Sequence, residues 1–214
     1  ARHERVLPSA YGEIARRARA LGATFFELVA SAVLSAMQAY NAARPRPPER
    51  VGLMFARARA RAADASFRAD TRAVTIPAIQ LAEPHHPHTL GELRRAVRDP
   101  GHDDLALAAL YAARKLRRPR SRGRGRPGEP RELDRLVFTL SDLTSFGRAF
   151  RQGDPRATVA VRDLRVLASP TSFDHAGMLV SRTGDDVRLA VVAHRGALDA
   201  EAFLDTTLTL LEVS

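Results

Sequence analysis

The segment 176–211 constrains the fold more than any other part of this chain. Two apolar runs rich in β-branched residues, 176–182 and 187–193, flank a Thr-Gly-Asp-Asp turn at 183–186, and this pattern predicts a β-hairpin. Asp199 is a good N-cap for a closing helix. Apolar side chains then recur at helical spacing, at Phe203, Leu204, Thr207, Leu208 and Leu211. We therefore expect the chain to end as strand, turn, strand and a helix whose apolar face covers the sheet.

Composition bounds the class of protein. With 214 residues, 45% of them hydrophobic and 27% charged, the chain can bury one good core and resembles an ordinary soluble domain. The absence of cysteine excludes disulfides and thiolate metal sites. No apolar run reaches the roughly 18 residues that a membrane span needs, so we expect a cytoplasmic protein without a membrane partner. No signal peptide is visible, and the start at Ala1 indicates a fragment or a trimmed chain.

The formal net charge of +10 is weaker evidence for nucleic-acid binding than it looks. Lys115 is the single lysine among 34 basic residues, and the rest are arginine. Together with the abundant alanine, this is typical of a GC-rich genome. An acidic protein partner would be served equally well by such a surface.

Two helices are expected near the start of the chain. Residues 1–8 are read as a linker, and Ser9 can cap a first helix that ends at Gly22. Its inward side chains are expected to be Ile14, Ala18 and Leu21. Thr24 and Glu27 form a capping-box pattern. The helix that they open, 25–40, is apolar nearly all round, which predicts burial on more than one side.

The middle of the chain reads as strands. Segments 51–55, 73–81, 133–140 and 158–167 have strand character, and Pro77 places the second of them at an edge or bulge. Arg57, Arg59 and Arg61 alternate with alanine after the first of these strands. On an extended chain they would share one face, so Arg57 is a candidate anion contact. A solvated edge or loop is the favoured alternative.

Two further helices and a basic segment complete the pattern. Thr89 and Glu92 suggest a second capping box, opening the helix 90–97, and a helix is expected over 105–116. Residues 117–131 are rich in arginine, glycine and proline, which predicts a flexible basic loop. The element order favours a single α/β domain over 1–214, a two-layer α/β sandwich in which helices cover a mixed β-sheet.

Four phrases in this order resemble the C-terminal lobe of the chloramphenicol acetyltransferase-like acyltransferase superfamily, which includes condensation domains, polyketide-associated acyltransferases and wax ester synthases. They are Ala20 to Thr24 before the buried helix, Val51 through Arg57, Phe138 to Gly147, and the closing hairpin and helix. The resemblance covers nearly the whole chain and rests on the order of these phrases. Asp142 and Thr144 stand where the family has Asn and Gly, and His194-Arg195 replaces its Tyr-Asp.

The resemblance implies that the catalytic base lies outside this chain. The family's base belongs to a His-His-x-x-x-Asp-Gly motif of the N-terminal lobe, where it takes a proton from the acceptor. Residues 85–91 mimic this motif, but Leu90 replaces its Asp, so we interpret them as a surface loop rather than a catalytic remnant. A metal site at His85, His86 and His88 is disfavoured, because Glu83 is the only evident carboxylate partner.

Site residues follow from the same resemblance. Ser141, Asp142 and Thr144 are implied to line the tunnel between two lobes, with Ser141 donating a hydrogen bond to the developing oxyanion. The alternative is a Ser/Asp turn that caps a strand end. Ser172, Asp174 and His175 are too close in sequence for a usual catalytic triad. No catalytic residue and no metal ligand of this chain is therefore predicted.

The implied function is acyl transfer from a CoA or phosphopantetheine thioester, used as the donor substrate, to a hydroxyl or amine in natural-product or lipid biosynthesis. No covalently bound cofactor is expected. The implied partners are an N-terminal acyltransferase lobe and an acyl or peptidyl carrier protein. One rival hypothesis is a non-catalytic module that docks a carrier. Nucleic-acid binding through residues 117–126 is disfavoured, because no aromatic residues are interleaved there for base stacking.

Overall fold

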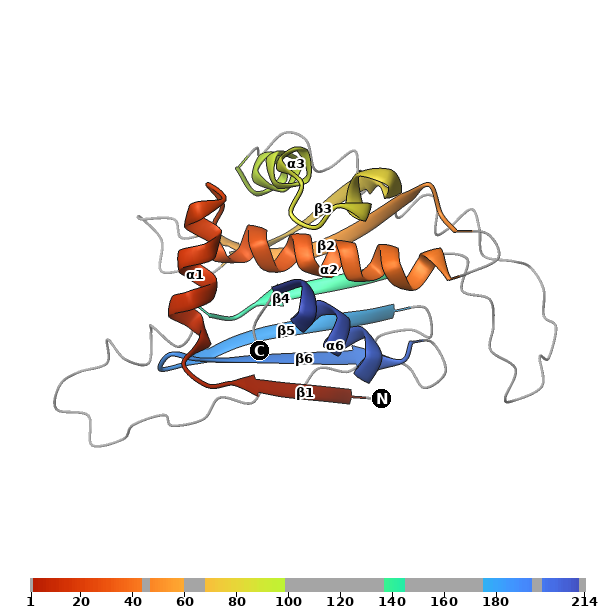
Figure 1. Ribbon diagram of the computed structural model, residues 1–214. Helices are drawn as coiled ribbons and strands as arrows, with labels where there is room; N and C mark the ends of the chain where they lie inside the picture. The colour runs from red at the N-terminus through yellow and green to blue at the C-terminus, as the bar shows by residue number, and fades with distance from the viewer. Residues whose placement is uncertain are drawn as a thin grey trace, which may run out of the picture.

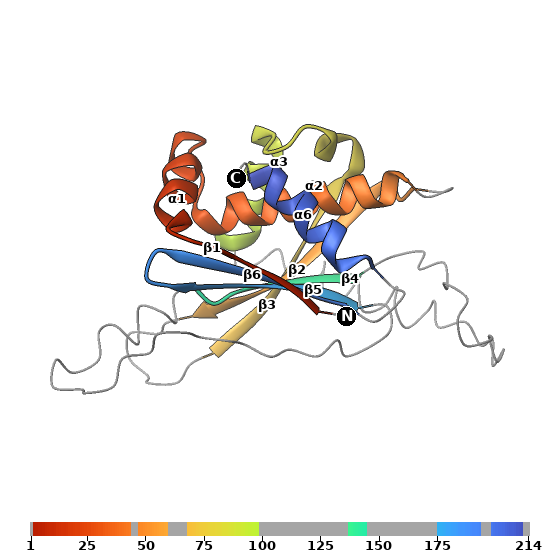
Figure 2. The same cartoon turned by 60° about the horizontal axis from the view of Figure 1, so that its bottom comes forward.

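The structure is a computed structural model that describes residues 2–43, 47–59, 68–98, 137–144, 175–193 and 198–211. For residues 56–59, 68–72, Val137 and His175 it describes the backbone alone. The described helices lie on one face of a six-stranded sheet, as Figure 1 and the turned view of Figure 2 show. The predicted α/β fold, with helices covering a sheet, is confirmed.

The sheet is mixed, with the strand order β1-β6-β5-β4-β2-β3. β4 is parallel to both β2 and β5, whereas the other neighbouring pairs are antiparallel. The strands are β1 (Arg2–Leu7), β2 (Arg50–Arg59), β3 (Arg68–Pro77), β4 (Val137–Asp142), β5 (His175–Thr183) and β6 (Asp186–Ala193). The carboxyl ends of β2, β4 and β5 therefore meet at the same end of the sheet.

The core lies between the sheet and the helices. Side chains alternate between the two faces of a strand, and on β4 the fully buried residues are Phe138 and Leu140. The rings of Phe138 and Phe203, from the closing helix, pack with their centroids 4.9 Å apart. Burial of these aromatic and aliphatic groups is the main stabilising contribution that the sequence offers.

The predicted hairpin and closing helix are confirmed. β5 and β6 pair from Ala176↔Ala193 to Thr183↔Asp186 around a turn whose Gly184 has φ +66. Asp199 caps α6 (Ala200–Leu211), and its Oδ1 accepts a hydrogen bond from the Ala202 N–H at 3.1 Å. The predicted apolar face of α6 is buried at Phe203, Leu204, Thr207 and Leu211, and Leu208 packs on the core.

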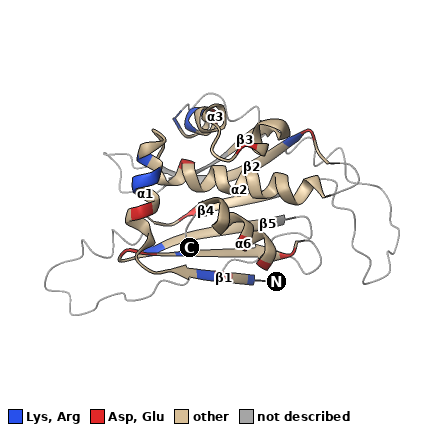
Figure 3. Ribbon diagram, viewed as in Figure 1, with Lys and Arg blue, Asp and Glu red and all other residues tan. Residues whose placement is uncertain are grey.

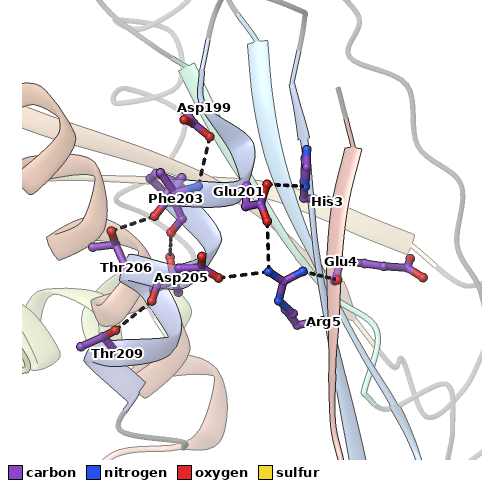
Figure 4. A network of polar contacts seen from close by, with 11 residues as sticks. His3, Glu4, Arg5, Asp199, Glu201, Phe203, Asp205, Thr206 and Thr209 are labelled. Carbon is purple, nitrogen blue, oxygen red and sulfur yellow. Dashed lines mark hydrogen bonds and ion pairs between the residues drawn. The ribbon is translucent and has the colours of Figure 1, made fainter.

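Residues 1–8 were expected to be a linker, and this is wrong. Residues 2–7 form the edge strand β1, paired antiparallel with β6. Ion pairs with other elements stabilise β1 although its sequence is polar. Arg5 lies 3.3 Å from Glu201 and 3.6 Å from Asp205 of α6, as Figure 4 shows. Glu4 pairs with Arg188 of β6 at 2.9 Å. The strand was missed because its charges contact residues far away in sequence.

The first helix, α1 (Ala10–Ala20), has the predicted position with two differences. Ser9 occupies the N-cap but makes no side-chain cap bond; its own N–H donates to Asp186 Oδ1 at 2.9 Å. Ile14 and Ala18 are buried as expected, whereas Leu21 is 44% exposed. Leu21 follows the last helical residue, and Gly22 with φ +63 then turns the chain away, so helical spacing no longer sets its direction.

The second helix, α2 (Phe25–Ala42), is the centre of the helical layer. The predicted capping box is confirmed, since the Glu27 N–H donates to Thr24 Oγ1 at 3.2 Å and the Thr24 N–H donates to Glu27 Oε2 at 2.9 Å. α2 contacts α1, α3, α6 and the sheet, which explains why it is apolar on nearly every face.

Replacing Thr24 by Ala should lower the free energy of unfolding by about 1 kcal/mol, because the Glu27 N–H then loses its acceptor. Chemical denaturation measures this change. The control is Thr206→Ala, at an exposed α6 residue whose hydroxyl bonds within its own helix, where the change should stay within about 0.5 kcal/mol. Equal losses in the two variants would contradict a capping role for Thr24.

The segment after β2 differs from its predicted boundaries. β3 ends at Pro77 on the sheet edge, as the proline suggested, but residues 78–82 form the 3₁₀ turn η1 (Ala78–Ala82) rather than more strand. Proline cannot donate to the strand ladder. The helix α3 spans Pro87–Arg98, so Thr89 lies inside it and the predicted capping box at Thr89 is wrong. His86 begins the helix instead, since its Nδ1 accepts from the His88 N–H at 3.1 Å.

Several expectations lie outside the described residues, namely the helix 105–116, the basic loop 117–131 and the strand 158–167. The described part of the strand expected over 133–140 is β4, which continues to Asp142. Among the described residues, no single helix is long and apolar enough to cross a membrane. α1 and α2 would satisfy that criterion only as a pair, and they are bent by 87°.

Candidate functional site

The candidate site residues lie where β4 ends. Ser141 and Asp142 are the last two residues of β4, not part of a turn as expected, and Thr144 follows two residues later. The Leu143 N–H donates to the Val180 carbonyl of β5 at 2.7 Å, which extends the attachment of β4 to β5 beyond the last strand residue. This end of the sheet is the one beside α1 (Figure 1).

Ser141 faces away from the helices. Leu140 is fully buried on the helix side, and successive side chains of a strand point to opposite faces. Ser141 therefore shares the other face with Thr139, and in the register its neighbour on β5 is Leu179. Its side chain is half-buried. The hydroxyl is thus carried by a rigid central strand on the side of the sheet opposite the described helices.

A hydrogen bond joins Asp142 and Thr144 at the end of β4. Asp142 Oδ1 accepts a hydrogen bond from the Thr144 N–H at 2.8 Å, the geometry of an Asx turn. The alternative interpretation of this segment, a polar turn that caps a strand end, therefore describes Asp142 well. Because Asp142 fixes the direction in which the chain leaves β4, it holds Ser141 in place from the following position.

Gly177 lets β4 and β5 approach each other closely beside Ser141. It pairs with Thr139, and a Cβ atom placed on Gly177 would lie 3.1 Å from the Thr139 carbonyl oxygen. Contacts that short are tighter than most real ones, so a larger residue would force the strands apart. The sequence showed a glycine in a strand, which suggests a close backbone approach, but not the strand that it approaches.

A polar cluster supports the end of β5, and the sequence did not reveal it. The Arg182 guanidinium lies over the Tyr11 ring of α1, 3.3 Å from its centroid. It also donates to the Gly184 carbonyl at 2.6 Å and to Asp185 at 2.8 Å. The Tyr11 ring in turn stacks on Phe25 of α2. α1, α2 and the hairpin are thereby joined at the end of the sheet that carries Ser141.

The histidine segment is not the uniform surface loop that was expected. His85 is buried, has φ +59, and its Nε2 lies 2.9 Å from the Leu210 carbonyl of α6. Because a carbonyl only accepts, Nε2 carries the proton and donates. His86 and His88 are more exposed and face Glu83 and Glu92 at 3.9 and 3.6 Å.

Metal binding has no support within the part of the chain that the structure describes. No group of three His, Asp or Glu side chains there could hold a metal ion. The Arg57 side chain lies outside the described atoms, although its backbone pairs with Asp70 in the β2–β3 ladder. Ser172 and Asp174 are also outside the described residues, and His175 is the first residue of β5.

The formal positive and negative charges of the described residues nearly cancel. They contain 15 arginines and 13 acidic side chains, compared with a formal net charge of +10 for the whole chain. Most of the positive excess therefore belongs to residues outside the described ranges. The positive excess is therefore not carried by the described strands and helices, on which basic and acidic residues both occur (Figure 3).

Comparison with known proteins identifies the fold. No family model matches the chain, and no curated protein matches it in sequence. Solved structures do match over nearly its whole length. The condensation domain of the enacyloxin polyketide synthase covers 99% of the chain at 16% identity and a TM-score of 0.58. The EpoB cyclization-docking bidomain from Sorangium cellulosum covers 100% at 17% identity and a TM-score of 0.57.

Acyltransferases match as well. The PapA2 acyl transferase covers 99% of the chain at 12% identity and a TM-score of 0.56. A chloramphenicol acetyltransferase covers 99% of the chain at 13% identity and a TM-score of 0.53. The chain spans 40–43% of the enacyloxin, EpoB and PapA2 chains, but 86% of the chloramphenicol acetyltransferase chain. This chain therefore has the fold of condensation domains and chloramphenicol acetyltransferase-like acyltransferases, as the order of its sequence phrases indicated.

Proposed function

We propose that this chain is one lobe of an acyltransferase or condensation enzyme, and specifically the C-terminal lobe. It would move an acyl group from a CoA or carrier-protein thioester to a hydroxyl or amine. The observation that carries this proposal is the likeness of nearly the whole chain to condensation domains and acyltransferases. Fold alone does not define chemistry, so the proposal also needs a site, and Ser141 provides its most specific feature.

The bonds formed and broken in the proposed reaction, and the proton that is moved, balance as follows. The acceptor oxygen or nitrogen attacks the thioester carbonyl carbon, a C–O or C–N bond forms, and the C–S bond breaks. A base takes the acceptor proton, which finally reaches the departing thiolate. Negative charge develops on the carbonyl oxygen between these events, and a fixed hydrogen-bond donor stabilises it. Ser141 would be that donor.

Two observations support the role of Ser141. Ser141 pairs with Leu179 of β5, the three residues before it are paired with β2 as well, and the Asp142–Thr144 turn and the Leu143–Val180 bond hold the next residues. Such rigidity keeps a donor oriented before charge develops, which is the physical basis of oxyanion stabilisation. By strand alternation from the buried Leu140, Ser141 also faces the side of the sheet opposite the described helices (Figure 2), and we propose that a second lobe or substrate meets it there.

The proton acceptor would come from a partner lobe. Among the described residues His85 is engaged with the Leu210 carbonyl. His86 and His88 lie at the start of α3, in the helical layer on the face of the sheet opposite Ser141 (Figure 2). The partners that we propose are therefore an N-terminal lobe that bears the catalytic histidine and an acyl or peptidyl carrier protein. The donor substrate would be a CoA or phosphopantetheine thioester, and natural-product or lipid biosynthesis is the proposed setting.

Ser141→Ala in the intact natural enzyme should lower kcat about 10²–10³-fold, the usual effect of losing an oxyanion donor. The KM for the thioester should change little, because the lost bond strengthens only as charge develops. Ser141→Thr keeps a hydroxyl and serves as the matched control, with most of the activity retained. Steady-state thioester-transfer assays measure both variants. Unchanged turnover of Ser141→Ala would remove this assignment.

A further inference from the structure

A stripe of buried polar side chains runs along α2. Glu27, Ser31 and Ser35 follow one another at intervals of four residues, so they lie on one face of the helix. Their relative exposures are only 1%, 0% and 5%. Within the described part of the chain, Glu27 Oε1, Ser31 Oγ and Ser35 Oγ have no hydrogen-bond partner. Buried polar atoms in folded proteins are rarely left in this condition.

The helix α6 shows the usual arrangement of hydroxyls inside a helix. The hydroxyls of Thr206, Thr207 and Thr209 each donate to the carbonyl four residues earlier, at 2.8, 2.9 and 3.0 Å, and Figure 4 shows two of these bonds. Ser31 and Ser35 make no such bond, although back-bonding is open to any serine within a helix. Their hydroxyls are therefore directed away from their own helix backbone.

The end of the stripe at Glu27 faces α3, which together with η1 forms the η1–α3 unit. Glu27 Oε2 lies 3.8 Å from Arg94 Nε of α3, which orients this end of the stripe. The neighbouring unit carries unpartnered oxygens of its own, namely Thr89 Oγ1 on the buried face of α3 and Gln80 Oε1 on η1. α2 contacts both elements. Unsatisfied oxygens are thus carried by α2 and by both elements of the unit that packs on it.

We propose that this interface binds a file of ordered water molecules along α2. Side chains four residues apart on a helix have Cβ atoms about 5–6 Å apart. A water that bonds two oxygens at about 2.8 Å each bridges them when they lie about 4.5 Å apart, and at most about 5.6 Å apart if the three atoms are collinear. We assign one water to the pair Glu27 and Ser31, and a second to the pair Ser31 and Ser35. A buried water makes about three hydrogen bonds, and the unpartnered oxygens of Thr89 and Gln80, on the elements that α2 contacts, would complete them.

The water file has a consequence for the way α3 is attached. α6 and the sheet are held to α2 by apolar packing, whereas the η1–α3 unit rests on it partly through water-bridged polar groups. Such contacts exchange their partners without opening an apolar core. We therefore expect the backbone amides of α3 to exchange with solvent faster than those of α6.

A crystal structure of the whole chain at about 1.5 Å resolution tests the proposal directly. The expected result is density for waters within about 3.2 Å of at least two of the oxygens of Glu27, Ser31 and Ser35. In solution, magnetic-resonance transfer from long-lived water to the amides of Ser31 and Ser35 should appear. Serine hydroxyls that instead bond to the Glu27 and Ser31 carbonyls, with no water density beside them, would overturn the proposal.

Variants separate bound water from a general change in packing. The double variant Ser31→Ala and Ser35→Ala should lose the water signal, and Ser35→Ala alone should lose part of it if the double variant does not fold. The matched control is Thr207→Val, which removes a buried hydroxyl that is already bonded within α6 and should leave the water signal unchanged. A water signal that survives in the folded serine variants would contradict the assignment.

Discussion

Replacing Phe138 by Ala is expected to lower the free energy of unfolding by about 3–5 kcal/mol. Phe138 is fully buried on the central strand β4, and its ring packs on Phe203 of α6 with 4.9 Å between centroids. The substitution removes apolar burial and leaves a cavity between the sheet and the helix that cannot close, because β4 is paired on both sides. The total free energy of unfolding of a domain of this size is typically about 5–15 kcal/mol. The variant should therefore be only marginally folded.

Chemical denaturation of the variant measures this loss through the transition midpoint at an unchanged slope. Ile79→Ala is the matched control, since Ile79 is 85% exposed and its truncation should change stability by no more than about 0.5 kcal/mol. A loss below about 1 kcal/mol for Phe138→Ala would mean that β4 and α6 do not pack as described.

Gly177→Val should be the second most damaging substitution, with a cost of about 2–3 kcal/mol from overpacking. The first added carbon would already lie 3.1 Å from the Thr139 carbonyl oxygen. That oxygen belongs to a neighbouring strand of a parallel ladder and has little freedom to move. Because β5 would be pushed from β4 beside Ser141, transfer activity of the intact enzyme should fall as well.

Gly52→Val on β2 provides the comparison for Gly177. A Cβ on Gly52 would have its nearest neighbours at 3.8 Å, the Thr75 hydroxyl and the Val74 carbonyl, which is ordinary contact. Valine suits a strand, so this variant should stay within about 1 kcal/mol of the parent in the same denaturation experiment. Similar losses at both glycines would show that strand spacing is not the reason for Gly177.

Much of the fold could be predicted from local patterns. The Thr24–Glu27 capping box, the Gly184 turn and the Asp199 cap depend on residues within a few positions of one another, and each was confirmed. The edge strand β1 could not be predicted in this way, because its charges are compensated by α6 and β6, nearly 200 positions away. The periodicity of apolar residues in a sequence indicates which side chains are buried, but it does not indicate ion pairs between distant residues.

The capping box at Thr89 failed for a related reason. The motif fits a helix start, but the side chain of His86 supplies an acceptor three residues earlier, and the helix begins there. Thr89 is then carried into the buried face of α3. His85 was interpreted as part of a surface loop because Leu90 replaces the Asp of the histidine motif. Its partner is a carbonyl at the end of α6 that only the tertiary fold brings near.

The end of the strand that carries Ser141 was predictable from the sequence, but the contacts around it were not. The polar phrase that begins with Ser141 marked the end of a strand, and the structure places Ser141 and Asp142 at the last positions of β4. The contributions of Gly177 and Arg182 depend on contacts with Thr139 and Tyr11, from elements distant in sequence. No short motif contains that information.

An acyl-transfer assay of this chain, with and without the proposed N-terminal lobe that would carry the histidine motif, tests the proposed function most directly. Thioester consumption and product formation are followed for this chain alone, for the proposed two-lobe enzyme, and for that enzyme without the motif histidine. The account predicts transfer by the intact enzyme, and at least about 10²-fold less without the histidine. Full transfer by this chain alone, or none by the intact enzyme with any CoA or carrier-bound thioester, would contradict it.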